Sequence, residues 1–246
     1  MQRLASARWI AAGLALLAVL VLFMAGAGSK IGLWGFGAGL GMLKWAAYIG
    51  VAAAVASLAL LAVLRPSGRV LGLLLVSTIV GLAVVALPWQ WRRIARTVPP
   101  IHDITTDLGN PPAFEAILPL RAEASNPAEY GGPEVAAQQR AAYPDIAPLF
   151  LEASTGSAFA RSLDVARGMG WEVVTADSAR GRIEAVATTK WFGFKDDVVI
   201  RIAQDGSRAR IDVRSVSRVG GSDVGTNARR IHDFIERVQV AAEPES

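Results

Sequence analysis

Long apolar runs without a charged residue dominate the first third of the chain. They cover residues 9–29, 45–64 and 70–91, and Arg or Lys flanks each of them on both sides. A helix rises about 1.5 Å per residue, so roughly 20 apolar residues cross a hydrocarbon core of about 30 Å. The pattern therefore predicts an all-α unit of three transmembrane helices within residues 1–95. Tryptophans mark the ends of these runs, where indole rings favour the membrane interface, at positions 9, 45, 89 and 91.

The segment 26–41, between the first two runs, holds seven glycines. Three pairs of them lie four residues apart, a spacing that lets helix backbones approach closely in lipid. We interpret the segment instead as a flexible loop, with Trp34 and Phe36 dipping into the membrane interface. Close contact between helices is the alternative interpretation.

Prolines then dominate a second region, residues 96–155. Nine of the 12 prolines of the chain fall within residues 99–155, and the residue before a proline is biased towards extended backbone. We predict an extended arm that packs on the following domain and contains a short helix at 133–142; a disordered linker is the alternative. Docking is favoured by apolar side chains along the arm, namely Ile101, Ile104, Phe114, Ile117, Leu118, Leu149 and Phe150.

Alternating and helical patterns mark a compact domain over residues 156–246. Ser157 is a candidate cap for a helix that ends at Gly168 or Gly170, and a second helix is expected over 223–240. Between the helices lie four runs with strand character, at 171–176, 182–189, 197–203 and 208–216. The order of elements predicts an α+β domain, with an antiparallel four-stranded sheet and two helices.

The dipeptide Asp205-Gly206 is a strong signal for a two-residue hairpin loop. Such a loop places Ile200 opposite Ile211 and gives the hairpin one apolar face. Because successive strand residues point to opposite faces, the other face is polar. It carries Arg201, Arg210, Asp212 and Arg214.

Charge is divided unevenly along the chain. The whole sequence has 25 Lys and Arg against 21 Asp and Glu, but residues 1–98 hold nine basic side chains and no acid. The remaining 16 basic and 21 acidic residues make the later part acidic, which excludes nucleic acid as an expected partner. The absence of cysteine excludes disulfides and thiol nucleophiles. Basic residues are balanced between the two sides of the three predicted spans, so they do not determine membrane orientation.

Two motifs carry most of the remaining information. They are the sequence WFGFKDDV at 191–198 and the sequence SVSRVGGSDVGTNARR at 215–230. With them, residues 100–240 resemble the family known as domain of unknown function 1499. That resemblance implies no established activity and assigns no catalytic residue. It implies an extracytoplasmic domain, so we expect a multi-pass protein of the bacterial inner membrane with a periplasmic soluble domain.

The second motif contains a glycine pair directly before the last predicted helix. Ser222 or Asp223 is placed to cap that helix and complement its dipole. The alternative is a site for an anion or polar ligand, because a glycine loop at a helix N-terminus exposes backbone N–H groups. Asp223 would compete with a bound anion, or it would pair with Arg218. Further binding candidates are Asn227, Arg229 and Arg230.

Asp196 and Asp197 form a second group of candidates with Asp223. The three carboxylates suit Ca²⁺ or Mg²⁺ if they converge, but adjacent acids at a strand start are more often solvated or paired with Arg. We predict neither a metal nor a cofactor. Ser222 lies outside the Gly-x-Ser-x-Gly pattern of a nucleophile elbow, and His102 and His232 are the only histidines, so a catalytic triad is not expected.

The hypothesis that follows is a non-catalytic interaction or ligand-binding domain of the cell envelope. Its expected partners are the lipid bilayer and an envelope protein. The alternative is a hydrolase-like or metal-dependent enzyme that uses Asp196, Asp197, Asp223 and Arg218. An open pocket around these four residues would favour the enzyme, whereas buried mutual pairing would favour a structural role. Transport by the helices is a third hypothesis, which requires several copies because three helices enclose no pore.

Overall fold

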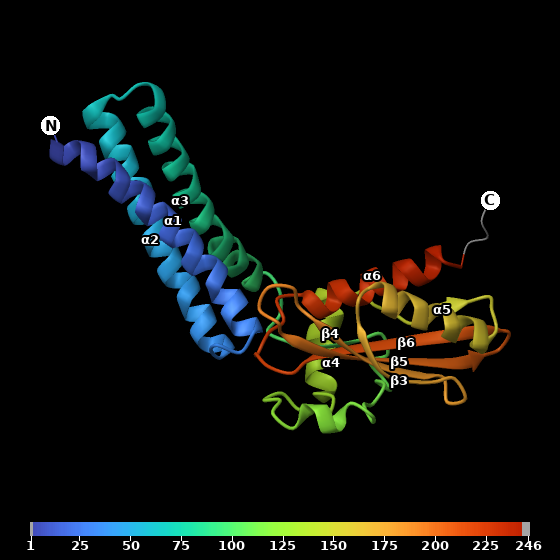
Figure 1. Cartoon of the computed structure of the whole chain (residues 1–246). Coiled ribbons are helices and arrows are strands. Elements are labelled where there is room, and N and C mark those ends of the chain that lie inside the picture. Colours follow the sequence, from blue (N-terminus) through green and yellow to red (C-terminus); the bar gives the residue numbers. More distant parts are fainter. Residues whose placement is uncertain (1, 243–246) are drawn as a thin grey trace. The chain divides into compact units, whose positions relative to one another are not determined.

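A computed structural model describes residues 2–242 of the chain, with only the helical backbone at residues 2–5. Internal contacts divide the chain into two compact units (Figure 1). The first consists of Met1–Ile94 together with Lys190–Gly193, and the second of Ala95–Thr189 and Phe194–Ser246.

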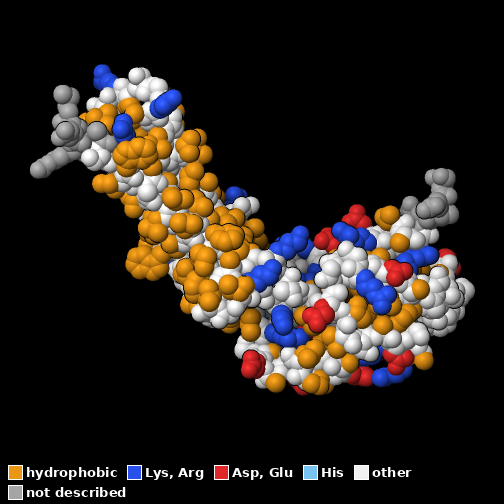
Figure 2. All heavy atoms as spheres, viewed as in Figure 1, with side chains coloured by type: hydrophobic (Ala, Val, Ile, Leu, Met, Phe, Trp, Pro, Cys, Tyr) orange, Lys and Arg blue, Asp and Glu red, His pale blue; other side chains and the backbone are white. Residues whose placement is uncertain are grey.

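The first unit is built from three long helices. They are α1 (Gln2–Lys30), α2 (Phe36–Leu64) and α3 (Gly68–Ala95). All three are long and apolar enough to cross a membrane. Large apolar side chains cover their outer surface in Figure 2, and Val55, Val76 and Ile79 are each more than half exposed.

The glycine-rich segment is mostly helical, so its interpretation as a flexible loop is wrong. Only residues 31–35 separate α1 from α2. A Cβ atom added to Gly39 would lie 2.5 Å from the carbonyl oxygen of Ala25, a separation that real Cβ atoms essentially never show. Gly39 therefore lets α2 approach the backbone of α1. Close helix contact, the alternative interpretation, describes this position better.

A second close approach joins α2 and α3, and it gives a testable prediction. A Cβ atom on Gly81 would lie 2.5 Å from the Gly50 carbonyl oxygen. We expect Gly81→Ala to destabilise the helical unit by about 1–3 kcal/mol through overpacking. The measurement is the midpoint of helix loss in mixed micelles as the share of denaturing detergent rises. Gly72→Ala is the matched control, because nothing lies within 4 Å of an added Cβ there and alanine favours the helix. A Gly81→Ala midpoint equal to that of the control would contradict the close approach.

The second unit contains one antiparallel sheet of six strands. Its main strands are β3 (Glu172–Asp177), β4 (Arg182–Thr188), β5 (Lys195–Asp205) and β6 (Arg208–Ser217). Two short strands of the arm, β1 (Asp103–Thr105) and β2 (Leu149–Leu151), both pair with β6. The strand order is β1-β6-β5-β4-β3, with β2 beside β1 on the same flank of β6. The prediction of four strands was therefore too low, because three-residue strands are too short to show an alternating pattern.

Helices cover one face of this sheet (Figure 1). They are α5 (Thr155–Gly168) and α6 (Thr226–Val240), while the arm contributes α4 (Gly132–Ala142), close to the predicted 133–142, and the short 3₁₀ helix η1 (Leu118–Arg121). The α+β class is confirmed. The cap of α5 is Ser154 and not Ser157, because the Ser154 hydroxyl accepts the backbone N–H of Ser157. The main core lies between these helices and the sheet, where Trp171 stacks on Phe234 at 5.4 Å.

The β5–β6 hairpin has a different register from the predicted one. Gly206 and Ser207 form the loop, and Gly206 adopts a positive φ of 60°. Ile200 therefore faces Val213, and Ile202 faces Ile211. The loop lies one residue later than predicted, so each β5 residue faces a β6 residue two positions further along the chain. A shift of two residues leaves every side chain on its predicted face of the sheet.

The arm covers the second face of the sheet. Phe114 and Ile117 are buried there against Val186, Val199 and Val216. The carboxylate of Glu184, fully buried on the same face, accepts the backbone N–H groups of Glu115 and Ile117. Two predicted anchors of the arm are not buried, since Leu118 is 46% exposed and Phe150 is 38% exposed. Phe150 instead packs against the guanidinium of Arg208.

Candidate functional site

The register of the central strands brings the two sequence motifs together. Asp196 pairs with Ser217 and Asp197 pairs with Val216. The start of β5, which belongs to the first motif, therefore lies beside the end of β6, which belongs to the second motif. The N-terminus of α6 is held at the same place by Asn227. Its side-chain amide donates to the His102 carbonyl at 2.9 Å and to the Ser217 hydroxyl at 3.1 Å.

The two adjacent acids point to opposite faces of the sheet. Val198 and Ile200 lie in the core under the helices, whereas Val199 lies in the core under the arm. Because side chains alternate along a strand, Asp196 shares the helix side and Asp197 shares the arm side. The four residues of the enzyme hypothesis therefore do not converge on one face.

On the arm side, Asp197 is the centre of a buried ion-pair cluster. Arg218 donates through Nε at 3.0 Å and through Nη2 at 2.7 Å to its carboxylate. Arg121 of η1 also donates to Asp197 and uses its other nitrogen to bond the Asn126 carbonyl at 2.8 Å. The Asp197 side chain is fully buried, and those of Arg121 and Arg218 are 4% and 13% exposed. This cluster ties the arm to β5 and β6.

On the helix side, Asp196 pairs with Arg230 of α6. Arg230 also donates to the Ser215 hydroxyl at 3.0 Å and to the side-chain oxygen of Asn227. The Ser215 hydroxyl donates to the same Asn227 oxygen at 2.7 Å. Asp196, Ser215 and Asn227 are all buried, so these polar groups satisfy one another away from solvent.

Asp223 occupies the position where an anion would bind the N-terminus of α6. Its carboxylate accepts the backbone N–H of Gly225 at 2.9 Å and that of Asn227 at 2.6 Å. The residue that directly precedes α6 is Gly225. Asp223 therefore accepts these backbone N–H groups from a position two residues before the cap. The Ser222 hydroxyl accepts the N–H of Val224. Arg218 pairs with Asp197, so the predicted pairing of Asp223 with Arg218 is not made.

The other candidates lie outside any convergent site. Arg229 bonds the Val224 carbonyl and the Thr226 hydroxyl next to its own helix. His232, which is not a site candidate, places Nε2 3.2 Å from a carboxylate oxygen of Asp145, and both side chains are substantially exposed. Across the described part of the chain, no group of three His, Cys, Asp or Glu side chains is arranged to hold a metal ion.

Burial gives Asp223 an unusual titration. Desolvation raises its pKa above the ordinary value of 3.8, although the bonds from Asn227 and Gly225 lower it. The negative charge of Asp196 also raises the pKa, and Arg230 lowers it. Because the pKa of Asp223 is higher in the folded protein than in the unfolded chain, the stability that protonation contributes is fully present below pH 3.8. This stability is lost as the pH rises through the folded-state pKa.

The raised pKa of Asp223 gives a prediction for the variant Asp223→Asn. We expect the variant to gain stability relative to the natural protein as pH rises through the raised pKa, because the amide carries no buried charge. The measurement is the free energy of unfolding of both proteins at pH values on either side of the transition. A stability difference that is independent of pH, or that changes in the opposite direction, would rule out the raised pKa.

Sequence reasoning missed the partners that the arm supplies. Arg121 and Asn126 close over the second motif, and the Asn126 amide donates to the carbonyls of Ser217 and Gly220, each at 2.9 Å. Arg214 pairs with Asp103 of β1 in a buried ion pair. One signal for Arg121 was available, since it is one of only two basic residues among residues 99–155.

Comparison with known proteins supports the resemblance seen in the motifs. A search of curated proteins finds no match to the chain. The family model described as "Protein of unknown function (DUF1499)" matches residues 103–238, which is more than half of the chain. The matched region contains both motifs and all six strands, and the three long apolar helices precede it. The chain therefore belongs to the DUF1499 family of proteins of unknown function.

Proposed function

We propose that this protein is a membrane-anchored binding module of the bacterial cell envelope and not an enzyme. Its second unit binds a ligand or an envelope protein, and its helices hold that unit at the membrane. The observation that carries the proposal is the mutual neutralisation of Asp196 by Arg230 and of Asp197 by Arg218 and Arg121. Carboxylates that are buried and neutralised by arginines are kept from solvent and from a substrate, so these groups serve the fold.

The lipid bilayer is the proposed environment of the first unit. Its large exposed side chains are apolar along three helices of spanning length, and such surfaces are unfavourable in water. We place the protein in the inner membrane with the second unit in the periplasm. This orientation follows from the extracytoplasmic setting that the family resemblance implies.

A pair of C-terminal fusions tests the proposed location. Alkaline phosphatase folds and acts only in the periplasm, whereas green fluorescent protein exported in the unfolded state stays dark there. We expect a C-terminal phosphatase fusion to be active and a C-terminal fluorescent fusion to be dark. Fluorescence with no phosphatase activity would place the second unit in the cytoplasm.

A further inference from the structure

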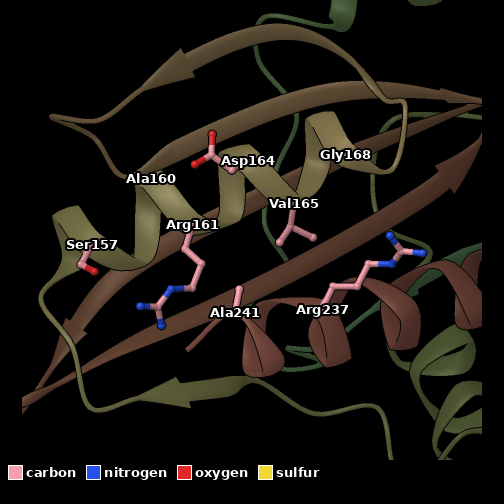
Figure 3. Close-up of a pocket in the computed structure, with 8 residues that line it drawn as sticks. All are labelled: Ser157, Ala160, Arg161, Asp164, Val165, Gly168, Arg237 and Ala241. Atoms are coloured by element: carbon pink, nitrogen blue, oxygen red, sulfur yellow. The ribbon is translucent and has the colours of Figure 1, made fainter. Parts of the chain in front are cut away.

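A groove of about 590 Å³ lies between α5 and α6 in the second unit, but its charged groups are spread apart. Figure 3 shows that Arg161 of α5 and Arg237 of α6 point to opposite ends of it. The first sequence motif is different, because the aromatic side chains of Trp191 and Phe192 converge with residues of three helices.

These two aromatic residues belong to a short loop, Lys190–Gly193, which joins β4 to β5 but is part of the first compact unit. We infer that this aromatic loop is a docking element, and that its partner is a glycine-lined seat on the long apolar helices of the same chain. The seat consists of Phe23, Gly26 and Lys30 of α1, Gly39 of α2 and Trp91 of α3. This inference is independent of what the second unit binds.

The indole ring of Trp191 packs on α1 at a position that requires glycine. A Cβ atom added to Gly26 would lie within 3.0 Å of three atoms of this ring, a separation that real Cβ atoms essentially never show. The indole nitrogen donates to the backbone carbonyl of Phe23 at 3.2 Å. Because an indole has a single N–H donor, this bond fixes which edge of the ring faces α1.

The other two helices complete the seat. The side chain of Phe192 is 4% exposed, and a Cβ atom added to Gly39 of α2 would lie 3.1 Å from its ring. Trp91 of α3 packs against both loop residues, with ring centroids 5.2 Å from Trp191 and 6.2 Å from Phe192. Aromatic rings attract one another at such separations. One loop of four residues therefore contacts all three helices.

The loop is closed at its base, which prepares it for docking. The backbone N–H of Thr189 donates to the Phe194 carbonyl at 2.8 Å, and the N–H of Phe194 donates to the Thr189 hydroxyl at 2.9 Å. Within the loop, Gly193 adopts a positive φ of 71°. The ammonium group of Lys30 donates to the Lys190 carbonyl at 3.1 Å. A preorganised loop loses little conformational entropy when it docks, as a recognition element requires.

A disulfide between the loop and α1 tests the inference in the full chain, which contains no cysteine. A Cβ atom on Gly193 would lie 3.2 Å from the Lys30 Cβ, close to the separation in a disulfide. We expect Lys30→Cys with Gly193→Cys to oxidise rapidly in native membranes, measured as the loss of maleimide-reactive thiols. Gly37→Cys with Gly193→Cys is the control pair and should stay reduced, because nothing lies within 4 Å of a Cβ added to Gly37.

Changing the seat separates recognition from proximity alone. In the first cysteine pair, Gly26→Leu should slow oxidation about tenfold through overpacking, whereas Gly13→Leu, in open space on the same helix, should leave the rate unchanged. Trp191→Ala should also slow it. Combining Trp191→Ala with Gly26→Leu should restore much of the rate, because leucine enters the space that the indole leaves.

Three results would overturn the inference. The first is a Lys30 and Gly193 cysteine pair that stays as reduced as the control pair. The second is an oxidation rate that Gly26→Leu changes no more than Gly13→Leu does. The third is a combined variant that oxidises no faster than Gly26→Leu alone, since the slowing would then come from damage to α1 and not from the lost fit.

Discussion

Replacing Asp197 with Ala is expected to destabilise the second unit by about 3–5 kcal/mol, because the change leaves two buried guanidinium groups without a counter-charge. Asp197 is fully buried and accepts from Arg218 and Arg121. Hydrogen exchange at the backbone amides of β5 and β6, read by mass spectrometry, measures the loss. Exchange should also accelerate in η1, since Arg121 joins the arm to this cluster.

The exposed pair of Arg180 with Glu115 provides the control. Arg180→Ala removes an ion pair on the same side of the sheet, but its side chain is 58% exposed, and we expect no measurable change in exchange. An Asp197→Ala protein that keeps the natural exchange rates would show that the cluster does not hold the fold. A catalytic role for Asp197 would then regain support.

Replacing Arg214 with Ala is expected to have a similarly large effect, about 3–5 kcal/mol, and to release the arm. Arg214 bonds both oxygens of Asp103, at 2.9 and 2.7 Å, and the carbonyls of Pro112 and Ala128. Its guanidinium also lies 5.0 Å from the ring centroid of Phe114. The substitution therefore leaves the buried carboxylate of Asp103 unpaired and removes four hydrogen bonds to the arm, two of them to backbone carbonyls.

Limited proteolysis measures the release of the arm. Cleavage within residues 107–131 should become faster in Arg214→Ala than in the natural protein, while cleavage elsewhere in the second unit follows only the overall loss of stability. Arg214→Lys should fall between the two, because it keeps the charge and loses the planar fork. Equal cleavage rates in all three proteins would contradict the role assigned to Arg214.

The local elements of the second unit were readable from the sequence because each has its own repeating pattern. Alternation identified β4 and β6 within one residue of their observed ends, and the apolar stripe of α6 predicted its C-terminal end at Val240. The same alternation also separates Asp196 from Asp197, since neighbours on a strand cannot share a face. Sequence alone could thus have weakened the hypothesis of a shared carboxylate site.

The long-range pairings were not readable. Strands β1 and β2 contain three residues each, and their pairing with β6 depends on contacts across more than 55 positions of the chain. The pairing of Asp197 with Arg121 of η1 could not be predicted for the same reason, because nothing near Arg121 in the sequence indicates which acid it contacts. The glycines of α2 were misread since their role depends on how closely a neighbouring helix approaches.

We propose that lipid covers the exposed apolar surface of the first unit. The chain has no cysteine, so single cysteines can be introduced at Leu20, Val55 and Leu82, whose side chains are 51%, 59% and 55% exposed. In native membranes we predict that a water-soluble maleimide leaves all three unlabelled and that a lipophilic maleimide labels them. Rapid labelling of these positions from water would contradict the claim, because burial within the protein does not protect them.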